Sequence, residues 1–489
     1  MSAIAIPEEE APKTPVDGVH VLYIVLAVVG FAGIVAWAYE LLMGLSATGM
    51  RDTISWGMYI FTFAFFIGLS AGGLIMASSA EVFGIKDLKP LSRLGVLSAA
   101  ACVLVAAIMI LPDLGRPARI FYLVLHPNLS SPLSWDILII GVYFLFSVID
   151  LIMLQRFHNG HGSGLAIRVL AYIGLPTAVL LHSVTAWIFG LQIARPWWNS
   201  SLMAPLFVVS AILSGTALVA LIALAAHRWG RFELGDATIN WLRGFIVVAL
   251  FIDLFLVGCE YITVLWGNTP GGMASINLVM PGGPFAWTFW VEWGVGGLLP
   301  LLLLLIPGLR RLRWALGVAA GLVLVGVLAF RIELIVVGLV NPIVQYAPGN
   351  STGTFIDGQS PFQYIGTYWP TWVEYCIVLG LIALFIAIVT VGYRAWIKPR
   401  ELEAPEADEY AETGEIEETG EVDQTEEVTP EDVAIKAEEV AARAEQQAAR
   451  AQSSKPVQQA AVAVQVSAQA VQVAARAVRR ESQLEPESV

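Results

Sequence analysis

The 489 residues of this chain are 57% hydrophobic and only 14% charged, and the net charge of −13 belongs to one end. Residues 401–489 hold 21 acidic and seven basic side chains, whereas the 400 residues before them hold 19 acidic and 20 basic ones. This composition indicates an integral membrane protein with a nearly neutral membrane part, and it argues against nucleic acid as a partner.

Ten stretches of mostly apolar residues follow one another, each long enough to cross a bilayer as a helix. They cover residues 20–46, 55–80, 91–112, 134–156, 166–192, 203–227, 238–266, 286–307, 313–340 and 372–396. We therefore expect an all-α polytopic membrane protein whose transmembrane domain occupies residues 20–400. Residues 1–19 form a short acidic, proline-containing segment, so the first span is itself the expected insertion signal.

The chain beyond residue 400 has a different composition. Residues 401–431 are rich in Glu with Pro, Thr and Gly, which is too polar to bury a core. Residues 432–480 are rich in Ala, Gln, Val, Glu and Arg, a composition that allows partner-dependent helices. We expect 401–489 to be a largely disordered, solvated tail, with a binding role as the alternative.

The orientation of the spans follows from the basic residues that flank them. One side carries Lys86, Lys89, Arg93, Arg156, Arg168, Arg228, Arg231, Arg310, Arg311, Arg313, Lys398 and Arg400. The loops of the other side offer only Arg51, Arg116, Arg119 and Arg195. The positive-inside rule then predicts that both termini are cytoplasmic. The loops with Asp113, Trp197 and Trp198 and the 341–371 connection are predicted to face outward.

Ionisable residues inside the spans are the strongest functional signal. Each costs about 2.5–3.5 kcal/mol at mid-membrane on insertion scales, so it usually has a partner or a function. Most of them fall toward the predicted outer leaflet: Asp113 and Arg116 where the third span emerges, and His182, Glu260, Arg331 and Glu333. Asp253 lies near mid-membrane, seven residues before Glu260. An ion pair of Arg331 with Asp253 or Glu260 is an equally supported structural interpretation. Carboxyls at span ends are expected to reach headgroup water, as at Glu40, Asp136 and Glu374.

Several kinds of redox centre are excluded by the residues that would hold them. Of six histidines only His182 lies well inside a span, which argues against a haem held by two histidines. The three cysteines stand alone in apolar runs, so neither an iron–sulfur cluster nor another metal site is expected. Protonatable groups beside apolar surface suit a lipid-soluble quinone, whose redox change moves protons. A secondary transporter and a passive membrane anchor are the alternatives.

Several motifs resemble the polysulfide reductase membrane-subunit (NrfD/PsrC) family. They are residues 56–59 (WGMY), 68–73 (GLSAGG), 113–117 (DLGRP) and 131–135 (SPLSW). Residues 182–187 (HSVTAW), 192–215 and 368–374 (YWPTWVE) resemble the ten-helix branch of that family, which includes membrane subunits of alternative complex III. The resemblance covers roughly residues 20–396 and leaves out the tail. Gly68, Gly72 and Gly73 are expected to allow close helix packing.

The resemblance implies a quinone- or menaquinone-interacting subunit of a respiratory oxidoreductase complex in the bacterial cytoplasmic (inner) membrane. It implies no haem or iron–sulfur cluster in this chain. An extracytoplasmic iron–sulfur partner would exchange electrons with it, beside a molybdopterin or multihaem cytochrome subunit. The family's fold pairs two four-helix bundles, which would cover about 55–192 and 203–340, with the first and last spans outside.

The resemblance also implies where the site lies, near the outer face of the first bundle. Asp113 and His182 would exchange protons with the quinone, and Trp56, Ser70 and Arg116 would bind it. Ser70 departs from some relatives, which carry histidine at the matching place, so another side chain would have to take that role. In the second bundle the candidates for a proton path are Asp253, Glu260, Arg331 and Glu333.

Overall fold

The computed structural model describes residues 16–51, 54–229, 232, 234–310, 312–341 and 368–396. All of them belong to the first of two compact units, Met1–Ala404, and the second unit is Pro405–Val489. The predictions for the tail at 401–489, for most of the N-terminal segment 1–19 and for nearly all of the 341–371 connection therefore lie outside the described residues.

The ten predicted spans are confirmed as ten helices that are long and apolar enough to cross a membrane in the described part. Seven are α1 Val16–Met43, α2 Met58–Val82, α3 Ser92–Asp113, α5 Pro132–His158, α6 Gly164–Gly190, α7 Met203–Arg228 and α8 Asp236–Gly267. The last is α15 Trp372–Trp396. The first span was predicted to run to residue 46 but ends at Met43, because Gly44 follows with a φ of 73°.

The eighth and ninth spans each contain a stretch of π-helix. The eighth consists of α10 Ala286–Phe289, the π-helix η3 Trp290–Leu298 and α11 Leu299–Leu305. The ninth runs through α13 Arg313–Ile332, the π-helix η4 Glu333–Val337 and α14 Gly338–Val340. Short elements link the spans: η1 Leu45–Ala47, η2 Lys86–Leu91, α4 Arg119–Leu125, α9 Pro270–Val279 and α12 Pro307–Arg310. A π-helix widens one turn and is frequent at functional sites.

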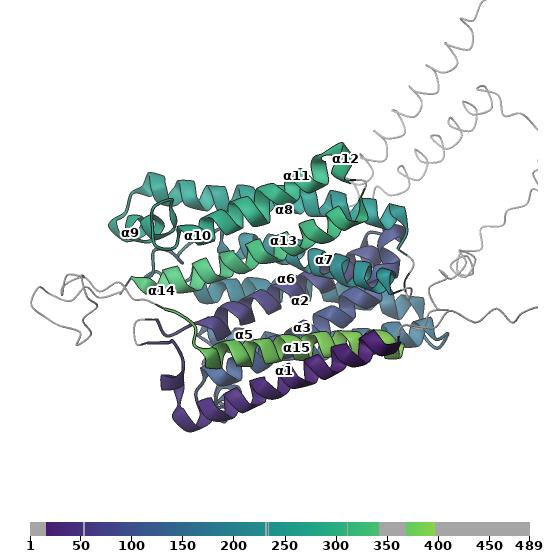
Figure 1. Ribbon diagram of the computed structural model, residues 1–489, viewed down its shortest axis with the longest axis horizontal. Coiled ribbons are helices and arrows are strands. Elements are labelled where there is room, and N and C mark those ends of the chain that lie inside the picture. Colours follow the sequence, from purple (N-terminus) through teal and green to yellow (C-terminus); the bar gives the residue numbers. More distant parts are fainter. Residues whose placement is uncertain are drawn as a thin grey trace, which may run out of the picture. The chain divides into compact units, whose positions relative to one another are not determined.

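Figure 1 shows the long helices of this unit lying side by side, with α1 and α15 together at one edge and α8 and α11 at the other. Helix α2 is central: it packs against α3, α6 and α7, and also contacts α13. Helices α3 and α6 contact α5, α7 contacts α8, and α13 contacts both α8 and the eighth span. The division into bundles at 55–192 and 203–340 remains our interpretation of this arrangement.

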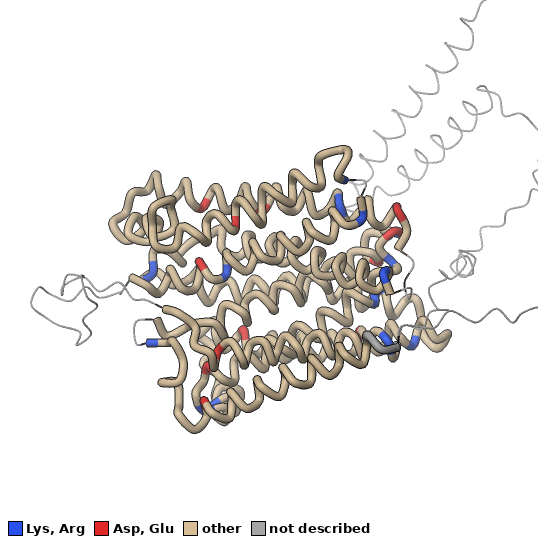
Figure 2. Tube along the Cα trace, viewed as in Figure 1, with Lys and Arg blue, Asp and Glu red and all other residues tan. Residues whose placement is uncertain are grey.

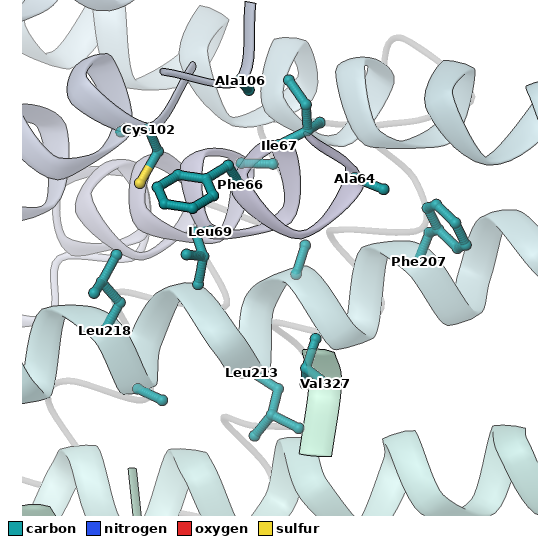
Figure 3. Packing of buried hydrophobic residues seen from close by; sticks show 14 of the residues in the cluster. Ala64, Phe66, Ile67, Leu69, Cys102, Ala106, Phe207, Leu213, Leu218 and Val327 are labelled. Atoms are coloured by element: carbon teal, nitrogen blue, oxygen red, sulfur yellow. The ribbon is translucent and has the colours of Figure 1, made fainter. Parts of the chain in front are cut away.

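Apolar side chains fill the junction between α2 and α7. Figure 3 shows Leu69 of α2 pointing toward α7 near Leu218, while Leu213 of α7 lies beside Val327 of α13. The burial of α2 explains why its apolar residues are not confined to one face. It is a core helix on all sides, and 89% of its most apolar window is buried.

Glycines set the helix separation at the tightest crossings, as expected at Gly72. A Cβ atom on Gly72 of α2 would lie 1.8 Å from the carbonyl oxygen of Ala211 in α7. A Cβ on Gly215 of the same α7 would lie 2.4 Å from the carbonyl carbon of Gly72. The α2–α7 contact therefore depends on backbones that touch directly, which only small residues permit.

The charged residues follow the helix ends and a few interior positions. Figure 2 shows Lys and Arg gathered at the end where α12 lies, while several Asp and Glu lie between the two ends of the helices. This distribution has the asymmetry on which the positive-inside prediction depends. The interior charges are the ones that require a chemical explanation.

Candidate functional site

A first polar group lies where α1, α3 and α15 come together. It contains the carboxyls of Glu40, Asp113 and Glu374, one from each helix. Asp113 interacts electrostatically with the other two, and its Oδ1 is buried without a hydrogen-bond partner. Three acidic groups thus share one small region with no basic side chain paired to them among the described residues.

Tyrosines and backbone amides hold this acidic group in place. Tyr59 donates a hydrogen bond to Glu40, and Tyr368 donates one to Glu374. The other oxygen of Glu374 accepts from the amide nitrogen of Gly49 at 2.7 Å and from that of Thr371 at 2.9 Å. Burial and the neighbouring Glu374 carboxyl raise the pKa of Tyr368, which lies outside the spans, so its hydroxyl remains a donor.

The expectation that span-end carboxyls reach headgroup water is wrong for all three residues. Glu40 is 2% exposed and Glu374 is fully buried, because α1 and α15 pack on each other and the turn after α1 folds over them. Asp136 is also buried, and it accepts a hydrogen bond from Thr185 at 2.6 Å. A position at a span end gives the depth of a residue but not what covers it.

The structure does not bring Asp113 together with Arg116. Helix α3 ends at Asp113, and the chain then turns at Gly115, whose φ is 62°. The side chain of Arg116 is exposed, and no ion pair joins it to Asp113 in the described part of the chain. Arg116 and Asp113 are therefore separate side chains in this arrangement, although both are candidates for one quinone site.

A second polar group joins His182 of α6 to Arg331 of α13. Both side chains are fully buried. Nη2 of Arg331 lies 3.2 Å from Nε2 of His182 and donates to the hydroxyl of Ser210 at 2.6 Å. The guanidinium also lies 3.9 Å from the ring centre of Phe207, a cation–π contact. Gly68 of α2 leaves room here, since a Cβ would lie 3.4 Å from the imidazole.

An aromatic series connects this second group with the loop between α6 and α7. Trp56 stacks on Trp198 of that loop at 5.8 Å between ring centres and meets Phe189 edge-on at 5.9 Å. Phe189 in turn lies 6.0 Å from Phe207, which lies 5.1 Å from the imidazole of His182. Two rings, Phe189 and Phe207, thus lie between Trp56 and the imidazole of His182.

Ser70 has a packing contact instead of a free hydroxyl. Its Oγ donates to the carbonyl oxygen of Ala99 in α3 at 2.6 Å. Tyr143 of α5 donates to the carbonyl oxygen of Ser70 at 3.0 Å. These bonds join α2, α3 and α5 inside the first predicted bundle. Sequence reasoning did not single out Tyr143, since a lone tyrosine in an apolar run carries no distinctive spacing.

A small cavity lies next to this second polar group, since Ser210, which binds Arg331, is one of its lining residues. It has about 10 Å³ of space open to the centre of a water-sized sphere, near the lower limit for one water molecule. Ser210, Asp253, Glu292, Gly296, Gly326 and Phe330 are among its lining residues. Asp253 is 8% exposed and Glu292 is 5% exposed, and each has one buried oxygen with no hydrogen-bond partner.

Of the two acidic residues predicted to pair with Arg331, Asp253 and Glu260, only Asp253 interacts with it. Asp253 and Glu292 interact electrostatically with its guanidinium, whereas Glu260 binds the hydroxyl of Ser200 at 2.7 Å. The sequence analysis did not single out Glu292, although an acidic residue inside the apolar span 286–307 could have drawn attention to it. Its place in the π-helix η3 could not be read from the sequence.

Both carboxyl oxygens of Glu333 have hydrogen-bond partners within the second predicted bundle. Its Oε1 accepts from the hydroxyl of Tyr261 at 2.7 Å, and its Oε2 accepts from Thr288 at 2.9 Å. Glu333 begins the π-helix η4, in which the carbonyl of Leu334 accepts from Nε1 of Trp198 at 2.6 Å. The loop before α7 thus binds the end of the ninth span.

Arg195 strengthens the same attachment. It donates to the carbonyl oxygen of Gly338 at 2.7 Å and lies over the ring of Trp198 at 5.1 Å. Burial lowers the pKa of Arg195, which lies outside the spans. A Cβ on Gly338 would lie 1.9 Å from Nε1 of Trp198, so this contact requires glycine.

Comparison with known proteins identifies relatives along most of the chain. The family model described as polysulphide reductase, NrfD, matches residues 46–342. A protein of Halobacterium salinarum, named as a membrane subunit of dimethyl sulfoxide reductase, is 36% identical over 78% of this chain and 92% of its own length. The Hdr-like menaquinol oxidoreductase integral membrane subunit of Archaeoglobus fulgidus is 30% identical over 78% and 94%. The menaquinone reductase integral membrane subunit of Nitratidesulfovibrio vulgaris is 24% identical over 75% and 89%.

Proposed function

The chain belongs to the polysulphide reductase NrfD family, and from this premise we propose that it is the quinone-interacting integral membrane subunit of a respiratory oxidoreductase complex. Two of its relatives carry menaquinol or menaquinone in their names, and each is named as an integral membrane subunit. Ten helices of spanning length give a lipid-soluble substrate direct access from the bilayer.

The proposed site uses the outer half of α2, α3 and α6. Asp113 and His182 would exchange protons with the quinone head, and Trp56 would provide apolar aromatic surface. The observation that carries this proposal is that Oδ1 of Asp113 and Nδ1 of His182 are both buried without a partner among the described residues. Such atoms have lost hydrogen bonds to bulk water and recover them when a ligand or a bound water supplies a donor or acceptor.

The electrons of the reaction would pass to or from a partner subunit. Oxidation of a quinol releases two electrons and two protons, and the proposed acceptor is an iron–sulfur protein on the outer face, beside a molybdopterin or multihaem cytochrome subunit. Both chain termini would lie in the cytoplasm and the membrane would be the cytoplasmic membrane, because the basic residues gather at the end of the helices where α12 lies.

The helices of the second predicted bundle, residues 203–340, would carry protons between the quinone site and one membrane face. Its candidates are Asp253, Glu260, Arg331 and Glu333, to which the structure adds Glu292. Buried carboxyls, hydroxyls and a water-sized cavity within reach of one another are the components that such a path requires.

The direct test replaces Asp113 by Asn in the intact complex and measures turnover with menadiol as electron donor. Asn keeps the size of the side chain but cannot take up a proton, so turnover should fall by about 100-fold or more, the range in which general acid–base groups contribute. The matched control is Asp236→Asn, an exposed aspartate at the start of α8 that pairs with Arg313.

Subunit content and the amount of assembled complex must stay unchanged in both variants. If Asp113→Asn and a second variant, His182→Gln, both retain full quinol turnover, the chain is a passive anchor and its partners bind the quinone. If only His182→Gln loses activity, the proton exchange belongs to the second polar group and Asp113 leaves the mechanism.

A further inference from the structure

The contact between Arg331 and His182 determines which ring nitrogen of the imidazole carries the proton. A guanidinium has only N–H donors, so Nε2 of His182 must accept the hydrogen bond from Nη2 of Arg331. A neutral imidazole has one accepting and one protonated nitrogen. The proton therefore lies on Nδ1, which is buried without a partner among the described residues.

The other side of the guanidinium has unused donors. Nε and Nη1 of Arg331 are buried and have no hydrogen-bond partner in the part of the chain that the structure describes. Asp253 and Glu292 lie in the same region, interact with Arg331 electrostatically and each keep an unpartnered oxygen at the cavity. Arg331 thus hydrogen-bonds to His182 and Ser210, and its unused donors have a second possible set of partners in the carboxyls of Asp253 and Glu292.

Charge and space allow movement between these sets. The carboxyls of Asp253, Glu292 and Glu333 outnumber the single guanidinium, so a neutral group requires protons on two of them. A water molecule in the cavity would lie beside Asp253, Glu292 and Ser210, and Ser210 binds the guanidinium. A Cβ on Gly68 would be in ordinary van der Waals contact with Nε2 of His182 at 3.4 Å and with Nη2 of Arg331 at 3.8 Å, so this glycine leaves room for about one methyl group between the two side chains.

We propose that Arg331 is a positioning residue that holds His182 in its Nδ1-protonated form, and that it must release Nε2 and turn toward Asp253 and Glu292 before His182 can take up a proton from a quinol. This inference rests on the proposed function, which places His182 at the quinone site. It links the quinone site to the second predicted bundle through the side chain of Arg331, which would have two arrangements.

The proton step conserves atoms and electrons. Once Arg331 has left, Nε2 is the accepting nitrogen, so an O–H bond of the quinol breaks and an N–H bond forms at Nε2. Nδ1 keeps its proton and serves as a hydrogen-bond donor to the ligand, and the electrons go to the iron–sulfur acceptor in the partner subunit. The protonated imidazole has donors on both nitrogens and can no longer accept from Arg331. Two adjacent cations also repel each other, which favours the arrangement with the guanidinium beside Asp253 and Glu292.

The first test is spectroscopic and needs no turnover. Solid-state NMR of the full chain in lipid, with ring-15N-labelled histidine, gives the protonation of each ring nitrogen, and the His182→Gln variant identifies the His182 signals. We expect a Nδ1-protonated His182 in the wild type and a loss of that preference in Arg331→Gln. Arg331→Lys should restore it, because an ammonium also only donates.

The matched control is Arg243→Gln, since Arg243 is another arginine largely buried in the second group of helices but binds Asn240 and the carbonyl of Leu312. It should leave the His182 signals unchanged. A wild-type His182 protonated on Nε2, or an unchanged spectrum in Arg331→Gln, would overturn the proposal. If Arg331→Gln does not fold, the wild-type and Arg331→Lys spectra decide.

The second test uses the intact complex with menadiol. Arg331→Gln and the pair Asp253→Asn with Glu292→Gln should lower kcat by about tenfold or more while KM stays within about twofold, because they impair a step after binding. If His182→Gln keeps full turnover while the spectra are as expected, the proposed quinone site fails and the positioning role stands. If His182→Gln is inactive but Arg331→Gln keeps both kcat and spectrum, the positioning role fails alone.

Discussion

Nη2 of Arg331 lies 3.2 Å from Nε2 of His182, so a helix of the first predicted bundle and a helix of the second meet at a buried hydrogen bond. A buried guanidinium loses several kcal/mol of hydration, which its new partners must offset. Phe207 is one of them, with its ring centre 3.9 Å from the guanidinium.

We expect Phe207→Leu to destabilise the protein by about 2 kcal/mol more than a matched aromatic replacement elsewhere, because a desolvated cation–π contact is lost. The matched change is Phe66→Leu, which removes a buried ring that faces Phe385. The measurement is the free energy of unfolding in mixed micelles. Equal losses in both variants would show that the guanidinium gains nothing from the ring.

Gly72→Ala should be among the most disruptive small changes in the chain. The added Cβ would lie 1.8 Å from the Ala211 carbonyl, so α2 and α7 must separate, at a cost of about 1–3 kcal/mol. Gly141→Ala in α5 is the control, since nothing lies within 4 Å of its Cβ. Thermal unfolding in detergent should show a clear loss for the first and no loss for the second. A Gly72→Ala protein as stable as Gly141→Ala would contradict the close crossing.

Tyr368→Phe should weaken the hydrogen-bonded link that Tyr368 makes between Met58 at the start of α2 and Glu374 of the last span. The hydroxyl accepts from the amide of Met58 at 2.6 Å and donates to Glu374, so its loss leaves a buried amide and a buried carboxyl each one partner short. The expected cost is about 1–3 kcal/mol. Tyr375→Phe in α15 is the control, at a side chain that is 47% exposed. Similar unfolding free energies for the two variants would argue against the hydrogen bonds.

Trp198→Phe tests the attachment of the outer loop to the π-helix η4. The change keeps an aromatic ring but removes the donor to the carbonyl of Leu334, which then lacks a partner for its free lone pair. We expect faster amide exchange in α14 and the end of η4, and a loss of about 1–3 kcal/mol in stability. Trp266→Phe, at a 90% exposed side chain, should change neither quantity. Unchanged exchange in Trp198→Phe would mean that the loop does not hold η4.

The ten spans could be predicted because each is a nearly continuous apolar run, and a run of that length indicates a transmembrane helix. The site was harder, since a span pattern gives the depth of a residue but not its helix neighbours. Asp113 and His182 share a predicted depth, yet Asp113 belongs with Glu40 and Glu374 while His182 belongs with Arg331.

The contribution of Glu292 and the burial of Glu40 depend on local geometry that leaves no pattern in the sequence. Glu292 lies in a π-helix, in which the i→i+5 bonds shift the direction of each side chain. Glu40 is covered because α1 packs on α15, two helices separated by almost the whole membrane domain in sequence. Hydropathy carries no information about either contact.

Photoaffinity labelling of the intact complex with an azidoquinone locates the quinone without a mutation. We expect labelled peptides from this chain within residues 56–73, 113–117 or 182–190, and loss of that label when menaquinone is added in excess. Labelling confined to partner subunits, or to residues 236–340 of this chain, would contradict it.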